Sequence, residues 1–162
     1  MSLRIDPNGL PEDGLHIEGR LAPAVLGLKP EDEVRPVSHL EYDLNVTRDE
    51  DGLIVLGRIA ATFDLACGRC AERFQLRMDL PQYVLDVPVE NGGAIDLTTW
   101  LREDMLLALP TFPRCETGNV TPRQCPAEGR FDPATETVRD APQEEDGEVW
   151  KALDQLENLK RN

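Results

Sequence analysis

The sequence predicts an α+β protein in which an antiparallel β-sheet, open or barrel-like, packs against one helix, with a second short helix at the C-terminus. Two observations predict this class. Three successive segments in the middle of the chain alternate apolar and polar residues, and a segment with helical spacing of its apolar residues follows them. The chain has 162 residues, enough for one domain with a core and marginal for two. We expect a single domain over residues 1–113, a Cys-containing and then flexible acidic loop over 114–148, and the terminal helix over 149–162.

The first 35 residues are predicted to be largely irregular. Proline and glycine recur there so often that each candidate element is interrupted within a few residues. Short strands at 3–5 and 15–21 are the elements that fit between these interruptions.

The three alternating segments are predicted to form the sheet. Residues 38–47, 53–66 and 73–89 place apolar side chains on every second position, which is the pattern of a half-buried strand. Asp51-Gly52, between the first two segments, is a strong signal for a hairpin turn. Three strands joined in succession predict an antiparallel meander.

The third segment contains a slip in its alternation. Apolar residues on even numbers up to Leu80 give way to apolar residues on odd numbers from Tyr83, with Pro81 at the join. Pro88 follows near the end of the segment. Because proline cannot donate a ladder hydrogen bond, this pattern predicts a β-bulge or an edge strand.

Residues 97–109 are predicted to form the main helix. Leu97, Leu101 and Met105 recur at helical spacing, which gives the segment one apolar face. Asp96 and the threonines after it can cap the N-terminus of the helix. The prolines at 110 and 113 end it.

The segment 149–162 regains helical periodicity after a stretch rich in acids and proline. Val149, Leu153 and Leu156 share one face, and Lys160-Arg161 suit the C-terminal end of a helix dipole. Two interpretations stay open for this amphipathic helix: it docks on its own domain, or it binds a partner.

Composition excludes several functions. The net charge is −14, so the mean field of the protein repels bare phosphate backbone. The chain lacks phosphate-binding glycine motifs and a nucleophile-elbow motif, and its two histidines, His16 and His39, leave little room for His-based catalysis. An apolar run long enough to span a bilayer is absent, and the first residues do not resemble a signal peptide, so we expect a cytoplasmic protein.

Four cysteines are the clearest candidates for a site. Cys67 and Cys70 form a C-x2-C motif between two predicted strands, where Gly68 allows a tight turn, as in a zinc knuckle. Cys115 and Cys125 follow the helix in a C-x9-C spacing rich in turn residues. We expect the four thiolates to share one zinc ion. Such an ion would be structural, since four protein ligands leave no coordination position open for catalysis. Unpaired thiols, or a redox pair formed by the first two cysteines, are the alternatives.

Four arginines give the clearest local concentration of positive charge and are the candidate partner-binding residues. They are Arg58, Arg69, Arg73 and Arg77, on or next to the strands that flank the C-x2-C motif. A phosphate-binding patch is one interpretation. Cross-strand pairing with the many acidic residues is the other.

Three segments, in this order along the chain, together resemble one protein family. They are Cys-Gly-Arg-Cys-Ala-Glu-Arg-Phe at 67–74, Gly-Ala-Ile-Asp-Leu at 93–97, and Arg-Glu-Asp-Met-Leu-Leu-Ala-Leu-Pro at 102–110, followed by Pro113 and Cys115. The combination is similar to the YceD-like family, the large ribosomal RNA subunit (23S) accumulation proteins. The match covers about residues 60–115 and continues more weakly towards Leu159.

The resemblance implies a bacterial or plastid-type factor that supports accumulation of large-subunit ribosomal RNA without a known enzymatic activity. It carries five residues over as motif positions: Cys67, Arg69, Cys70, Glu103 and Cys115. The spread of the second cysteine pair over nine residues departs from the tighter cluster of many members.

The expected partner is a ribosomal protein or large-subunit rRNA. The net charge of −14 favours a basic ribosomal protein, whereas direct contact with RNA would have to use the four arginines. Two alternatives from other classes remain open: a thiol redox or sensor protein that uses Cys67 and Cys70, and a general protein-interaction module.

Overall fold

The computed structural model describes residues 2–50, 52–88 and 93–128. These residues belong to one compact unit, Met1–Glu128, so residues 114–128 pack on the same body as the sheet. The predicted terminal helix at 149–162, and the part of the predicted loop beyond residue 128, lie outside the described residues.

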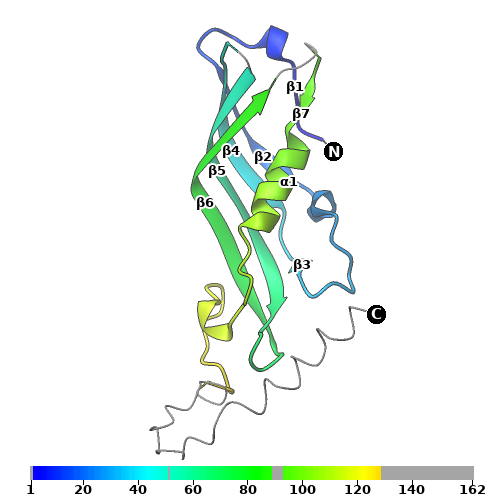
Figure 1. The fold of residues 1–162 in the computed structure, drawn as a ribbon, viewed down its shortest axis with the longest axis vertical. Helices are drawn as coiled ribbons and strands as arrows, with labels where there is room; N and C mark the ends of the chain where they lie inside the picture. The colour runs from blue at the N-terminus through cyan, green and yellow to red at the C-terminus, as the bar shows by residue number, and fades with distance from the viewer. Residues whose placement is uncertain (1, 51, 89–92, 129–162) are drawn as a thin grey trace, which may run out of the picture. The chain divides into compact units, whose positions relative to one another are not determined.

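The α+β class is confirmed, with most of the described structure in one antiparallel sheet (Figure 1). Its strands are β2 (Leu15–Leu21), β3 (Arg35–Pro36), β4 (Leu40–Arg48), β5 (Gly52–Ala66) and β6 (Arg73–Pro88). β2 pairs with β4, and β4 with β5; β3 pairs with the same side of β5 farther along, and β6 pairs with its other side. Of the open and barrel-like forms, the described strands adopt the open one, in which β2, β3 and β6 are the edges.

One face of the sheet carries the core, as the alternation predicts. Apolar side chains at every second position of β4, β5 and β6 point to this face. Those with no exposed surface on the central strands are Leu40, Leu44, Val46, Leu53, Val55, Ile59, Ala61 and Phe63. The opposite face is mostly charged.

The main helix, α1 (Leu97–Leu107), covers the core face. Leu97, Leu101 and Met105 have no exposed surface, and Asp96 accepts a hydrogen bond from the Thr98 amide at 3.0 Å, which caps the helix as predicted. The helix ends two residues before the predicted position 109, because residues that precede a proline disfavour helical backbone.

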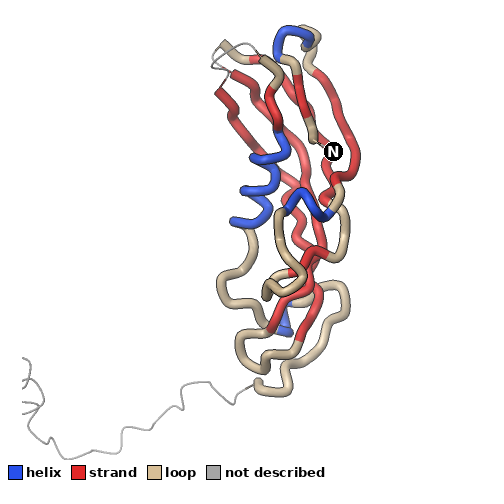
Figure 2. The backbone as a smooth tube through the Cα atoms, turned by 90° about the vertical axis from the view of Figure 1, so that its right-hand side faces the viewer, coloured by secondary structure: helices blue, strands red, loops and turns tan. Residues whose placement is uncertain are grey.

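Short elements complete the cover of the core. β1 (Arg4–Ile5) pairs with β7 (Ile95–Asp96), which ties the N-terminus to the start of α1. The 3-10 helix η2 (Pro23–Leu26) lies beside α1 (Figure 2), and its Leu26 is fully buried. A second 3-10 helix, η1 (Pro7–Gly9), follows β1. The expected strands at 3–5 and 15–21 are thus confirmed within a residue.

The predicted bulge is present in β6. Gly57 of β5 is opposite Tyr83 and Ile59 is opposite Leu80, so one residue of β5 faces two residues of β6. Pro81 is one of these two residues. The bulge returns Tyr83 to the core face after the slip in the sequence pattern. Gly57 is required beside it, because a Cβ there would collide with the carbonyl oxygen of Asp43.

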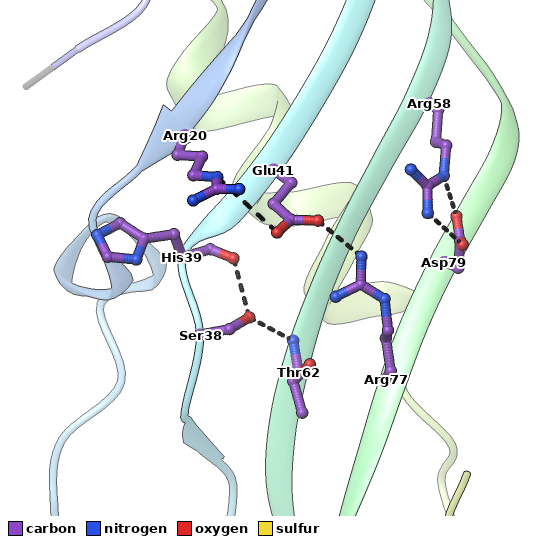
Figure 3. Close-up of polar contacts among 8 residues, drawn as sticks. All are labelled: Arg20, Ser38, His39, Glu41, Arg58, Thr62, Arg77 and Asp79. Atoms are coloured by element: carbon purple, nitrogen blue, oxygen red, sulfur yellow. Dashed lines mark hydrogen bonds and ion pairs between the residues drawn. The ribbon is translucent and has the colours of Figure 1, made fainter. Parts of the chain in front are cut away.

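Ser38 joins the ends of β3 and β4 to β5 (Figure 3). Its hydroxyl accepts a hydrogen bond from the Thr62 amide at 2.8 Å and donates one to the His39 carbonyl at 3.0 Å. The amide of Val37 donates to the Thr62 carbonyl at 2.9 Å. The backbone of β5 therefore stays hydrogen-bonded where it passes from one neighbouring strand to the other.

Candidate metal centre

The first cysteine pair lies in the turn between β5 and β6. Cys67 directly follows β5, and its carbonyl accepts a hydrogen bond from the Ala71 amide at 2.9 Å. Ala71 has a φ of 60°, the left-handed conformation that reverses the chain tightly. The Gly68 amide donates to the Pro113 carbonyl at 2.8 Å, which holds the segment after α1 against the turn. The expectation that the C-x2-C motif forms a tight turn between two strands is confirmed.

The second cysteine pair is carried by the loop after α1. Cys115 begins the 3-10 helix η3 (Cys115–Thr117), and this loop packs along the start of β6. The side-chain amide of Asn119 accepts from the Arg77 amide at 2.7 Å and donates to the Arg77 carbonyl at 2.9 Å. These two bonds imitate a neighbouring strand, so they fix the loop against the edge of β6.

The four sulfur atoms form one cluster. Their Sγ atoms all lie within 4.8 Å of one another, with 3.9 Å between Cys67 and Cys125 and 3.4 Å between Cys70 and Cys115. All four are free thiols, and three of them are buried. A tetrahedral site with metal–sulfur bonds of about 2.3 Å would place its sulfurs about 3.8 Å apart. The cluster therefore fits one tetrahedral metal ion.

Hydrogen-bond donors surround the sulfurs. The Arg69 amide lies 3.5 Å from the sulfur of Cys67, and Nη2 of Arg123 lies 3.2 Å from the sulfur of Cys115. Arg123 also donates from Nη1 to Glu72 at 2.6 Å. A cation and an amide facing the sulfurs stabilise negative charge on them, as the surroundings of a thiolate–metal site do.

The sulfur pKa values respond differently to these surroundings. Burial raises the pKa of Cys67, but backbone N–H donors from Cys70 and Arg69 outweigh it and lower the value to about 6. Burial, followed by hydrogen bonding with Cys70, raises the pKa of Cys115. Several negatively charged thiolates repel one another when they are buried close together. A divalent cation bound between them would compensate this charge.

Arg123 is the site residue that the sequence interpretation missed. Its side chain makes contacts with Glu72 and Cys115, and its Nε is buried without a hydrogen-bond partner among the described residues. Its position two residues before Cys125 was the available signal. An arginine near a cysteine is common by chance, so the signal is weak without the fold.

The turn geometry differs from that of thioredoxin-like redox motifs. Such motifs open a helix, whose N-terminus lowers the thiol pKa. Here Cys70 leads through two residues into β6, and the neighbouring described elements are both strands. The turn between strands, with all four sulfurs close together, fits a metal-binding turn rather than a thioredoxin-like motif.

The four predicted partner-binding arginines all form ion pairs with carboxylates. Arg58 donates two hydrogen bonds to Asp79, at 2.8 and 2.6 Å, and Arg77 donates to Glu41 at 2.6 Å (Figure 3). Arg73 pairs with Asp64 at 2.6 Å, and Arg69 with Glu116 at 2.9 Å.

Cross-strand pairing, the second interpretation, is thus what the structure contains for Arg58, Arg73 and Arg77. Binding of a partner by the four arginines stays a prediction. The pair of Arg77 and Glu41 passes over β5, which lies between their strands (Figure 3). Glu41 is opposite Ala60 and Arg77 is opposite Thr62, and these two β5 residues are both buried. Arg69 lies apart from this pair, at the cysteine turn.

No helix in the described part of the chain is long and apolar enough to cross a membrane. Comparisons with family models, curated proteins and solved structures gave no match.

Proposed function

We propose that the protein is a cytoplasmic, non-enzymatic factor that supports 23S rRNA accumulation during assembly of the large ribosomal subunit, and that its four cysteines hold a structural zinc ion. The observation that supports this best is the position of Cys115. It follows the Leu-Ala-Leu-Pro motif in sequence and lies 3.4 Å from the sulfur of Cys70. Two of the segments that resemble the YceD-like family therefore contribute to one cluster.

Zinc is the metal that this donor set favours. Four thiolates in a tetrahedron are typical of zinc and of iron–sulfur proteins, and the C-x2-C turn between strands is typical of zinc knuckles. Bound to four protein ligands, the ion would have no position for a substrate. Its role would be to tie the β5–β6 turn to the loop after α1.

A basic ribosomal protein is the proposed direct partner. The chain carries a net charge of −14, and the four candidate arginines already pair with carboxylates. Phosphate groups would have to break these ion pairs, whereas a basic protein meets the excess acidic charge directly.

The metal proposal is tested by elemental analysis of protein purified without added metal. We expect close to one zinc ion per chain, and loss of zinc in a C70S/C115S double variant. Iron in place of zinc, or readily oxidised thiols with no metal, would contradict the proposal; the second result would indicate a thiol redox or sensor protein.

The ribosomal role is tested by co-sedimentation of the full chain with ribosomal precursors. We expect the protein in fractions that contain large-subunit precursors, and reduced 23S rRNA when it is depleted. Its absence from every such fraction would contradict the function. Tight binding to pure rRNA at physiological salt would contradict the preference for a protein partner.

A further inference from the structure

The outer edge of β6 is covered over only part of its length by described residues. Near its start, Asn119 pairs with the backbone of Arg77, and Nη2 of Arg123 reaches the Arg73 carbonyl at 3.4 Å. Beyond the bulge, no described strand pairs with this edge. Residues 82–87 form a run without proline between Pro81 and Pro88, long enough to pair with another extended segment.

An exposed apolar pair lies next to this open edge, on the largely polar and charged face of the sheet. Val84 of β6 is directly opposite Leu56 of β5. Val84 is 67% exposed and Leu56 is 45% exposed, although both are large apolar side chains in strands. An exposed apolar pair at an unpaired strand edge is the arrangement expected where an added strand would bury it.

Among the described residues beside this pair, the charge that has no ion-pair partner is negative. Asp86 lies two residues beyond Val84 on the same face, is exposed, and forms no ion pair with a described residue. Asp79, before the bulge, is held by Arg58. A second copy of the chain would bring another net charge of −14 and another Asp86 to this edge. A cationic segment meets no such repulsion.

We propose that residues 82–87 of β6 bind an extended, basic peptide segment of a partner protein as an additional strand. Backbone hydrogen bonds along the edge provide the binding energy, an apolar side chain of the segment packs on Val84, which is itself opposite Leu56, and its cationic side chains face Asp86. The surface does not extend to the start of β6, because Asn119 and Arg123 already contact the backbone there. Residues 82–87 would thus be the surface that binds the basic ribosomal protein. Only the identity of this partner rests on the proposed function.

The test uses the full chain and a short synthetic peptide that repeats Val-Thr-Lys-Thr, so that valine and lysine lie on the same face of the added strand, as Val84 and Asp86 do on β6. Binding is measured by titration, and amide hydrogen exchange is followed by NMR. We expect binding that protects amides within 82–87. We expect the Val84→Lys variant to bind about tenfold more weakly, since it replaces the apolar contact by a cation. Val37→Lys is the matched control, because Val37 is 48% exposed and lies on β5's other side.

Several results would overturn the inference. Equal affinity of wild type and Val84→Lys would do so, as would protection confined to β2, or equal binding of a peptide of similar composition interrupted by prolines. Self-association of the wild type that Val84→Lys abolishes would identify a second copy as the occupant instead.

Co-sedimentation with ribosomal precursors separates this inference from the proposed function. If Val84→Lys still enters the precursor fractions as the wild type does, the binding edge is wrong and the function stands. If the wild type binds the peptide through residues 82–87 but enters no precursor fraction, the function is wrong and the edge stands.

Discussion

At the scale of single residues, the surroundings of the sulfurs matter as much as the sulfurs. Arg123 places a positive charge 3.2 Å from the sulfur of Cys115 and is itself held by Glu72. Side chains that contact metal ligands in this way orient them and reduce their loss by protonation. Arg123 should therefore slow the release of the ion.

We predict that Arg123→Met releases zinc to a chelator about tenfold faster than the wild type. Methionine keeps an unbranched apolar stem but removes the charge near the Cys115 sulfur. The measurement is the rate of transfer to a coloured chelator. Arg20→Met is the control, because Arg20 is 72% exposed and belongs to β2. Equal release rates for the two variants would contradict a role of Arg123 at the metal.

A second residue-scale prediction concerns acid stability. The hydrogen bond from Arg77 lowers the pKa of Glu41 below its ordinary value of 4.5. The carboxylate thus stabilises the fold fully above about pH 4.5, and this contribution is lost as the pH falls through the lower pKa of the folded state.

We expect Glu41→Gln to lower the free energy of unfolding at pH 7 by about 0.5 to 1 kcal/mol, because the carboxylate is partly exposed and solvent screens the pair. The difference from wild type should shrink below about pH 4.5. Urea unfolding at several pH values measures it, with the exposed Glu12→Gln as control. A difference that stays constant down to pH 3 would count against this account.

At the scale of elements, the β5–β6 pair is the centre of the fold. These long strands carry the bulge in the middle and the cysteine turn at their end. The bulge keeps Tyr83 on the core face, where its hydroxyl donates a hydrogen bond to Asp104 of α1 at 2.6 Å. It therefore links the register of the sheet to the position of the helix.

We predict that Gly57→Ala destabilises the protein by about 2 kcal/mol, because the added Cβ collides with the backbone of β4 at Asp43 and Leu44. Thermal or urea unfolding measures the change. Gly9→Ala is the matched control, since its added Cβ would come no closer than 4.0 Å to Asp6. A Gly57→Ala variant as stable as the control would show that the strands can separate at the bulge without cost.

At the scale of the whole molecule, the cysteine cluster joins parts that are far apart in sequence. It connects the β5–β6 turn to the loop that follows α1, and Gly68 and Pro113 add a backbone hydrogen bond between the same parts. A bound ion stabilises the folded state by an amount that grows with the logarithm of its affinity. The ion would thus hold the C-terminal part of the described unit on the sheet.

Removal of the metal by a strong chelator is predicted to lower the Tm by at least about 5 °C. Addition of zinc in excess of the chelator should restore it. Calorimetry measures both changes, and the C70S/C115S variant serves as control because it should respond to neither treatment. A Tm that the chelator leaves unchanged in zinc-loaded wild type would indicate that the fold does not depend on the cluster.

The elements of this protein were predictable from sequence because their signals are local. Alternation at every second residue predicts β4, β5 and β6, and the slip at Pro81 predicts the bulge. Asp96 and the apolar spacing after it predict α1. The C-x2-C motif between two strands predicts the turn that presents two sulfurs. Each of these patterns depends on residues a few positions apart, so the chain itself carries the information.

Tertiary structure alone decided the long-range pairings. Cys125 reaches the cluster because Asn119 and Arg123 hold its loop on β6, and no spacing rule encodes those contacts. Each candidate arginine pairs with a carboxylate from another part of the chain, as Arg77 does with Glu41. The positions of charged residues in the sequence do not specify which of them pair. The sheet is open rather than barrel-like because β2 pairs with β4 and β6 pairs with β5, and these two strands do not pair with each other among the described residues. These outcomes depend on which distant segments meet, and that is settled only when the whole core packs.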